Sequence, residues 1–291
     1  MISTRKGATL ALIVAQALVM VGGIAAAVNI DDRCNGLLRQ ALENKNPDVR
    51  VLAVVALSLA AARESDSARL EAMLQDKDVE VRLSAVASLA EVNTASAQAA
   101  LRRALNDDIP EVSFAAAKTL WALHDPAGQQ ALMAVLQNES KTSSPFFSKQ
   151  KRDALRMLHT PRVLFFFAVR QSMGFVPVPG LGGGINSMQS LLTDPGISGR
   201  ATAALLLGKD KSAATLDALK DALLDKDWSV RAAAVHSLAL RDDPALKRDL
   251  EPLLDDEKEP VRLRAAAGIL RLSAVEENLA KKKQVKPIKR K

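Results

Sequence analysis

The sequence is poor in the residues that usually build reactive sites. Among 291 residues there is one cysteine, Cys34, and no tyrosine, and aromatic residues make up 3%. A single cysteine excludes both a disulfide within the chain and a metal site made of several cysteines. The three histidines, His124, His159 and His236, are far apart in the sequence, and no Gly-x-Ser-x-Gly or zinc-binding motif is present. We therefore predict no catalytic residue, no metal and no cofactor.

Alanine and leucine take the place of the missing aromatic residues. Hydrophobic residues make up 48% of the chain, which is enough for a sizeable core. Small apolar residues suit helices that pack closely, and alanine has the highest intrinsic helix propensity. The composition therefore predicts an all-α protein.

A pattern of three residues recurs through the chain at a fixed interval. A basic residue is followed by alanine three positions later and by leucine seven positions later, so that all three share one helix face. The triplets are Arg50-Ala53-Leu57, Arg82-Ala85-Leu89, Lys151-Ala154-Leu158, Arg200-Ala203-Leu207, Arg231-Ala234-Leu238 and, with isoleucine last, Arg262-Ala265-Ile269. Ser113-Ala116-Leu120 keeps the spacing without the basic residue. Most steps between neighbouring triplets are 31 or 32 residues, which is typical of a repeat architecture.

A second helix is predicted before each triplet. Leucine pairs four residues apart recur there, as in Leu38 and Leu42 or Leu219 and Leu223, and Met188 with Leu192 has the same place before Arg200. Turns rich in aspartate and asparagine separate the two helices, and these side chains can cap the second helix. The unit is therefore a helix, an acidic turn and a helix, and about seven such pairs would form an α-α superhelix.

The pattern D-x-x-x-x-V-R-x-x-A-x-x-x-L, seen over 225–238, resembles that of HEAT repeats, and the short period resembles the type named after phycobilisome lyases. The resemblance covers roughly 35–275 with one interruption. It implies an interaction scaffold, although some such proteins are bilin lyases, iron-dependent hydroxylases or DNA glycosylases. The hydroxylases use paired His-Glu motifs, and the chain contains no His-Glu dipeptide.

The arginine of each repeat has two interpretations. Arg50, Arg82, Arg200, Arg231 and Arg262 could form an array that binds anions. Alternatively, each could bond the turn aspartate of its own or a neighbouring repeat, since guanidinium groups suit fixed geometry with carboxylates. We favour this structural ladder, because every arginine comes with an acidic turn.

The N-terminal residues predict export. Arg5 and Lys6 precede an apolar stretch, and Ala25 and Ala27 fit the A-x-A pattern of signal peptidase sites. We predict that 1–27 is a signal peptide; an uncleaved membrane anchor is the first alternative and a buried helix the second. Either of the first two would place the body outside the cytoplasm, periplasmic or secreted, as in bacteria.

An apolar insert, 161–184, separates HEAT-like repeats over 34–160 from those over 185–275. Phe165, Phe166, Phe167 and Phe175 fall within it and are the predicted partner-binding residues, with peripheral contact to a membrane as a further use. The alternative is that the insert packs against the repeats. Its glycines lack the lysine of a phosphate-binding loop.

The basic excess of the chain lies at its end. The net charge is +7, and 281–291 alone contains seven basic and no acidic residues. We predict that 276–291 is a disordered tail, either a solvated end or a segment attracted to an anionic surface. With the rest of the chain neutral, nucleic acid is not the favoured partner. The favoured function is a non-enzymatic scaffold for an unidentified protein partner; the alternatives are a bilin or cofactor lyase, and a nucleic-acid or anionic-surface binder.

Overall fold

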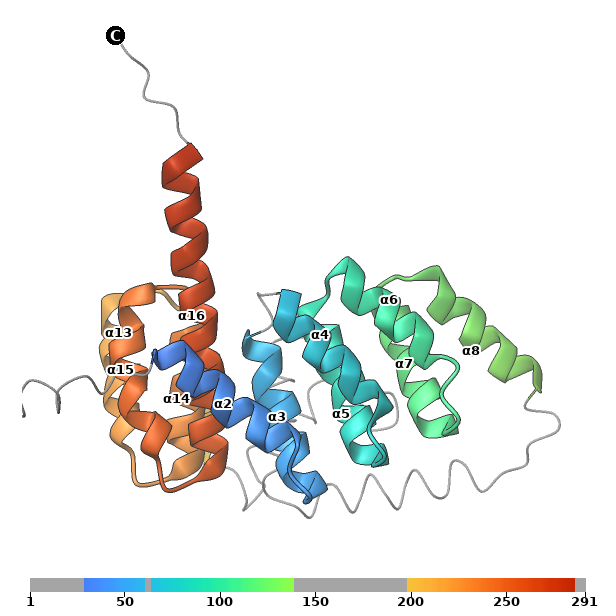
Figure 1. The fold of residues 1–291 in the computed structure, drawn as a ribbon, viewed down its shortest axis with the longest axis horizontal. Helices are drawn as coiled ribbons and strands as arrows, with labels where there is room; N and C mark the ends of the chain where they lie inside the picture. The colour runs from blue at the N-terminus through green and yellow to red at the C-terminus, as the bar shows by residue number, and fades with distance from the viewer. Residues whose placement is uncertain (1–28, 61–63, 139–197, 286–291) are drawn as a thin grey trace, which may run out of the picture.

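The computed structural model describes residues 29–60, 64–138 and 198–285, which form helices and, within these ranges, no strand. Short acidic turns join these helices into antiparallel pairs (Figure 1). The first helices of the pairs are α2 (Ile30–Leu42), α4 (Glu64–Ala72), α6 (Ala95–Ala104), α8 (Pro126–Asn138), α13 (Ala213–Asp221) and α15 (Lys247–Leu250). The second helices are α3 (Pro47–Ala60), α5 (Val79–Val92), α7 (Pro110–Ala122), α12 (Gly199–Leu207), α14 (Trp228–Ala239) and α16 (Glu259–Val285). Short 3-10 segments, η1 (Met73–Gln75), η3 (Ala222–Leu224), η4 (Pro244–Leu246) and η5 (Glu251–Asp255), flank some first helices.

The core is built from the repeated alanine and leucine positions. Ala53 and Leu57 of α3 are fully buried, as are Ala234 and Leu238 of α14. The small alanine lets the two helices of a pair approach closely, and the leucine fills the space one turn further along. The all-α solenoid predicted from the sequence is therefore confirmed.

The pattern departs from this rule at α12. Ala203 is exposed and Leu207 is 43% exposed. The first helix expected to cover them, around Met188 and Leu192, lies outside the described residues. The same holds for the Lys151 triplet, His159 and the predicted insert.

The order of the pairs in space differs from their order in the sequence. The second helices pack side by side in the series α12, α14, α16, α3, α5, α7, and α8 follows α7. The last described pair thus packs against the first, because α16 contacts both α2 and α3. In Figure 1 the orange and red helices lie beside the blue ones, and the green α8 lies at the opposite end. Contacts in the stack are therefore not limited to pairs that are neighbours in the sequence.

Helix α16 is much longer than the other second helices. Its first half is buried in the stack, whereas its end projects from the body (Figure 1). The sequence predicted disorder from residue 276, but the helix continues to Val285. A nucleated helix extends cheaply, since each added residue gains a backbone hydrogen bond, and Lys281 and Lys282 near its C-terminus suit the helix dipole. None of the described helices, α16 included, has the length and apolar character needed to cross a membrane.

Candidate functional site

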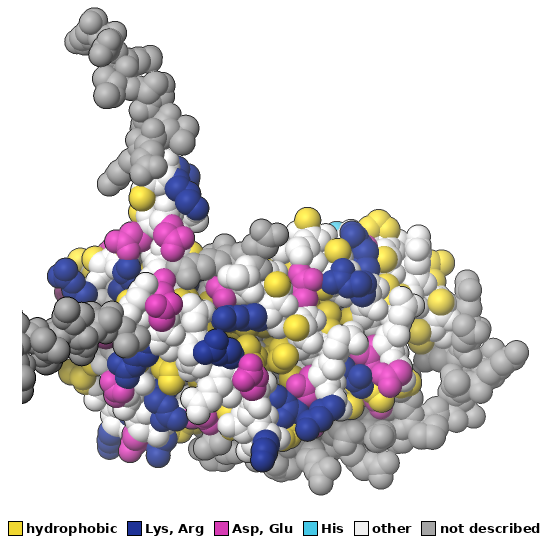
Figure 2. Space-filling model, viewed as in Figure 1, with side chains coloured by type: hydrophobic (Ala, Val, Ile, Leu, Met, Phe, Trp, Pro, Cys, Tyr) yellow, Lys and Arg dark blue, Asp and Glu magenta, His cyan; other side chains and the backbone are white. Residues whose placement is uncertain are grey.

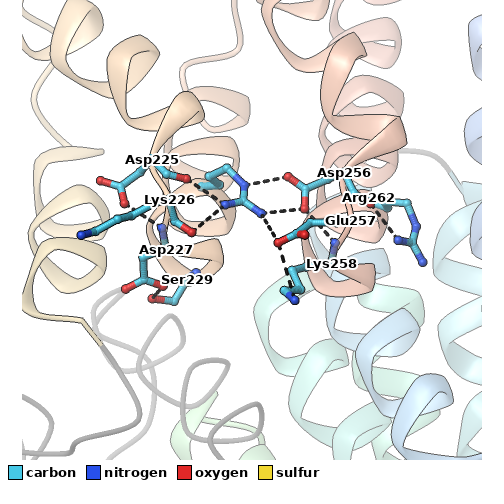
Figure 3. A network of polar contacts seen from close by, with 9 residues as sticks. Asp225, Lys226, Asp227, Ser229, Asp256, Glu257, Lys258 and Arg262 are labelled. Atoms are coloured by element: carbon cyan, nitrogen blue, oxygen red, sulfur yellow. Dashed lines mark hydrogen bonds and ion pairs between the residues drawn. The ribbon is translucent and has the colours of Figure 1, made fainter.

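Arginine–aspartate rungs connect successive helix pairs along one edge of the stack. In the best-formed rung, Arg231 of α14 donates through Nε and Nη2 to both carboxylate oxygens of Asp256, at 2.7 and 2.8 Å. Its Nη1 donates to the backbone carbonyls of Asp225 and Lys226 in the preceding turn. Figure 3 shows the Asp225 turn on one side of this network and the Asp256 turn on the other, and the hydrogen bonds of Arg231 join them. One side chain thereby fixes its own turn and that of the next pair.

The Arg50 rung has the same geometry. Arg50 donates through Nε and Nη2 to Asp76, both at 2.8 Å, and through Nη1 to the carbonyls of Asn44 and Lys45. Asp76 also accepts the backbone N–H of Asp78, so it closes its own turn while it receives the arginine. Both members are nearly buried, which makes the bidentate pair a structural bond rather than an open anion site.

Protonation equilibria follow from these contacts. Burial opposes ionisation of Asp76, but the hydrogen bonds from Arg50 and Asp78 outweigh it, and the pKa of this carboxyl is lowered. The same balance, with Arg231 as donor, lowers the pKa of Asp256. Hydrogen bonding to Asp256 raises the pKa of Arg231. These rungs therefore stay charged throughout the neutral pH range.

The other predicted arginines make weaker versions of the rung. Arg82 contacts Asp107 at 3.6 Å and Asp108 at 3.1 Å, and the more exposed Arg200 pairs with Asp225. Arg262 donates to the Asp256 carbonyl at 2.8 Å; no ion pair to a carboxylate is found for it within the described parts of the chain. The turn that follows Arg262 in space holds Asn44, the counterpart of Asp76 and Asp256, which closes its turn through Asn46 but has no charge.

The histidines do not form a cluster in the described structure. His124 takes a left-handed conformation with φ 58° at the end of α7, and His159 lies outside the described residues. His236 of α14 is buried, and its Nδ1 lies 3.1 Å from Nη1 of Arg264 on α16. Since arginine can only donate, Nδ1 accepts and Nε2 holds the proton. No group of three or more potential metal ligands occurs among the described residues.

Burial decides the charge state of this pair. Desolvation, with the nearby Arg264 and Arg271, holds the pKa of His236 well below its usual value. Desolvation likewise lowers the pKa of Arg264 to about 10, offset in part by Glu91. His236 is thus a neutral acceptor for a buried cation. The repeat pattern did not reveal this pair, because Arg264 falls where other repeats have Leu52 or Ala233.

The thiol of Cys34 is no reactive site. The residue is fully buried in α2, and burial raises its pKa to about 12. A thiol that is neutral and inaccessible at physiological pH is a poor nucleophile.

An aromatic and cationic surface lies on α7, near the end of the stack. Phe114, Lys118 and Trp121 follow one another at helical spacing, and the Lys118 ammonium lies 5.6 Å from the centre of the Phe114 ring. Trp121 is 53% exposed. The corner after it is tight: a Cβ added at Gly128 of α8 would lie 2.2 Å from the Trp121 backbone nitrogen. This corner fixes the position of Trp121, and we call the three residues the α7 surface.

The predicted partner-binding residues Phe165, Phe166, Phe167 and Phe175 lie outside the described residues. Over the face seen in Figure 2, charges of both signs are interspersed, as expected for a body with little net charge. Such a surface shows no broad basic patch in this view, which gives no support to nucleic-acid binding there.

Comparison with known proteins identifies the repeats. The model of the family described as HEAT repeats matches residues 67–143 and 186–271. No curated protein matches the sequence. Among solved structures, human deoxyhypusine hydroxylase in complex with glycerol is 17% identical, covering 85% of this chain and 97% of its own, with a TM-score of 0.31.

The complex of CpcE and CpcF of phycocyanin lyase from Nostoc sp. PCC7120 is 15% identical, covering 88% of this chain and 96% of its own, also with a TM-score of 0.31. Superpositions of this quality carry no argument about activity. The family model, in contrast, matches more than half of the sequence, and the repeats it matches have the paired helices described above. This chain belongs to the HEAT-repeat family.

Proposed function

We propose that this protein is a scaffold that binds a protein partner outside the cytoplasm and catalyses no reaction itself. The observation that carries the proposal is the α7 surface, where a half-exposed tryptophan lies beside a phenylalanine and a lysine on a braced helix. Tryptophan is prominent among the residues that dominate binding energy at protein interfaces. The close packing of Gly128 against the Trp121 backbone holds this part of α7 in place, and a binding residue on a rigid element loses less entropy on binding.

Partner capture from a cell-envelope fraction tests this proposal. Trp121→Ser removes the aromatic side chain from a position that is already half exposed, so the fold should persist. We expect the captured partner to be lost. Leu224→Ser is the matched control, because Leu224 is 87% exposed but lies in η3, away from α7. Equal capture by both variants would contradict the role of the α7 surface.

The predicted role of the phenylalanines is a separate arm of the same experiment. A variant with Phe165, Phe166, Phe167 and Phe175 replaced by serine should lose the partner if they also bind it. If this variant captures the partner normally, the phenylalanines have no part in binding and the α7 surface alone remains.

The location outside the cytoplasm rests on the N-terminal sequence. Helix α2 begins at Ile30, and the Asn29 side chain accepts the Asp31 N–H to cap it. Cleavage after Ala27 would leave this cap in place. We expect intact-mass measurement to give a protein that begins at Val28 in the exported fraction. A full-length protein in the membrane fraction would indicate an anchor, and a full-length protein free in the cytoplasm would contradict export.

A further inference from the structure

The last part of helix α16 extends beyond the stack. Leu272 and Ala274 are buried, whereas every residue from 276 to 282 is exposed. The helix continues to Val285, and at ~1.5 Å per residue the stretch 276–285 is ~15 Å long. Figure 1 shows this end of α16 pointing away from the other described helices. We call the stretch 276–285 the distal end of α16.

Charges of opposite sign are separated along the distal end. Glu276 and Glu277 lie at its base, and no acidic residue follows them in the sequence, whereas 281–291 contains seven basic residues. Two of these, Lys281 and Lys282, have exposed side chains on the described helix. In Figure 2 acidic side chains lie where the helix leaves the body, and basic side chains lie further along it.

The acidic residues of the body do not cancel these cations. The chain has 40 basic and 33 acidic residues, so the seven basic residues of 281–291 account for its whole net charge of +7. Glu276 is paired with Lys247 of α15. Val285 lies ~12 Å along the helix from Glu277, which is farther than the Debye length of ~8 Å at physiological ionic strength. The cations therefore act mainly on a surface that the distal end touches.

The arrangement of the lysines fits a flat partner better than a groove. Consecutive helix residues are ~100° apart around the axis, so positions 281, 282 and 283 are spread around the helix instead of sharing one face. A helix that binds in a groove of DNA presents its contact residues on the side that enters the groove. Positions 279 and 285 hold the large apolar residues of the distal end, and they too lie on different sides of the helix. Without an apolar face, the distal end is suited to contact with headgroups and not to insertion among lipid chains.

We propose that the distal end of α16 binds an anionic lipid surface by charge, with its lysines on the headgroup phosphates. Clusters of about four to eight basic residues are attracted to anionic lipids, and the attraction increases with each added cation. The seven basic residues of 281–291 fall within this range. This binding uses no residue of the α7 surface and is independent of the proposed partner binding, so Trp121→Ser should leave it unchanged.

Vesicle binding by the full-length chain tests the proposal. Co-sedimentation measures partition onto vesicles of phosphatidylcholine alone and onto vesicles of equal parts phosphatidylcholine and phosphatidylglycerol. The ratio of the two partition coefficients isolates the effect of charge, because the apolar N-terminal stretch would bind both kinds of vesicle. We expect this ratio to be well above one and to fall as salt is added. In the triple variant Lys281→Gln, Lys282→Gln and Lys283→Gln it should drop by about tenfold.

The matched control removes the same charge from the body. Lys45, Lys77 and Lys226 are exposed in three of the turns between paired helices, and replacing them with glutamine lowers the net charge equally. We expect this control to keep most of the vesicle ratio, and circular dichroism should show that both variants stay helical. An equal fall in the two variants would overturn the proposal, since net charge alone would then explain the binding.

Two further results would also overturn it. A ratio near one for the unmodified chain would show that the distal end is only a solvated helix end. Binding to a mixed-sequence DNA duplex but not to the anionic vesicles, lost in the same triple variant, would assign the cations to nucleic acid instead.

Discussion

Two neighbouring interfaces of the stack differ in how they are bonded. The α14–α16 interface joins consecutive pairs, and the α16–α3 interface joins the last described pair to the first. Both have buried alanine at the middle repeat position and a buried leucine or, in α16, isoleucine at the last one. At the first, Arg231 spans to Asp256 with two hydrogen bonds. At the second, Arg262 faces a turn that has Asn44 where the other turns have aspartate.

The junction uses different polar contacts instead. Arg33 of α2 pairs with Asp255 of η5, and the Ser273 hydroxyl of α16 donates to Asp31 of α2 at 2.8 Å. Matching apolar faces therefore decide which helices can stack, and the rung is an additional bond between consecutive repeats. Because apolar burial is non-directional, it stabilises contacts between consecutive pairs and between the last and first pairs alike.

The largest predicted effect is the loss of a buried rung. Arg231→Met removes the cation and leaves the nearly buried Asp256 carboxylate without it. We expect a loss of about 3 kcal/mol in the free energy of unfolding, because breaking a buried pair strands a charge. Urea denaturation followed by circular dichroism measures this value.

The matched control is Arg200→Met. Arg200 has the same position in its repeat, but its side chain is 56% exposed. A solvent-exposed pair contributes about 0.5 kcal/mol. If both variants lose the same stability, burial does not distinguish the rungs and the comparison between them fails.

The next effect concerns pH at the α14–α16 interface. The pKa of His236 is lowered in the folded protein, whereas the unfolded chain takes up its proton near pH 6.5. The unfolded state therefore binds more protons below this pH, and stability falls as the pH falls, by about 1.4 kcal/mol per unit. We expect a loss of about 2 kcal/mol between pH 6.5 and pH 5.

His236→Gln should remove most of this pH dependence, because glutamine does not titrate. The carboxyls of Asp76 and Asp256, whose pKa values are lowered, lose their contribution only below about pH 4 and do not interfere. Parallel urea titrations of both proteins at pH 7.5 and pH 5 measure the difference. A variant that keeps the full pH dependence would show that another group causes it.

A smaller effect is predicted at the junction. Ser273→Ala removes the hydroxyl that bonds Asp31, and we expect a loss of about 1 kcal/mol, typical of one hydrogen bond. Ser237→Ala is the control at the α12–α14 interface, where the hydroxyl donates to the Ala204 carbonyl at 2.9 Å. Chemical denaturation of the two variants should give similar losses. If Ser237→Ala lowers the free energy of unfolding and Ser273→Ala does not, the contact between Ser273 and Asp31 is contradicted.

The smallest predicted effect is an increase in stability. Asn44→Asp places a carboxylate in the turn that follows Arg262 in space and should create the missing rung. We expect a stabilisation of about 0.5 kcal/mol, since both positions are partly exposed. Thermal unfolding of Asn44→Asp alone and with Arg262→Met measures it. If the stabilisation persists without Arg262, it does not come from a rung.

The sequence predicts the units of this fold better than their order. Arg231, Ala234 and Leu238 share one helix face, and this spacing predicts both the second helix and its buried side. The sequence also predicts the turn aspartates. The spacing alone does not decide whether Arg50 bonds its own turn or the next. The structure shows that it does both, through different nitrogens.

The stacking order was not predicted, because identical units fit together in any order. The sequences of the terminal repeats do indicate that they are covered. In an open solenoid, the terminal repeats have a polar outer surface. Here α3 has Leu52 and Leu59 on the far side of the helix from its core leucine, and α16 has Leu263 and Leu270, all buried. The Arg264–His236 pair was missed because no other repeat has arginine at the Arg264 position, which is Leu52 and Ala233 in two repeats and Ser84 in another.

Crosslinking of α2 to the η5–α16 region tests most directly whether the last described pair packs against the first. Arg33 and Asp255 are both exposed and in contact, so Arg33→Cys and Asp255→Cys, combined with Cys34→Ala, place two accessible thiols next to each other. A short bis-maleimide reagent in dilute solution should link them within one monomer. Arg33→Cys with Asp108→Cys should give no such link, because Asp108 precedes α7. Failure of the first pair to link, or links only between two copies, would contradict the packing of α16 against α2 and α3.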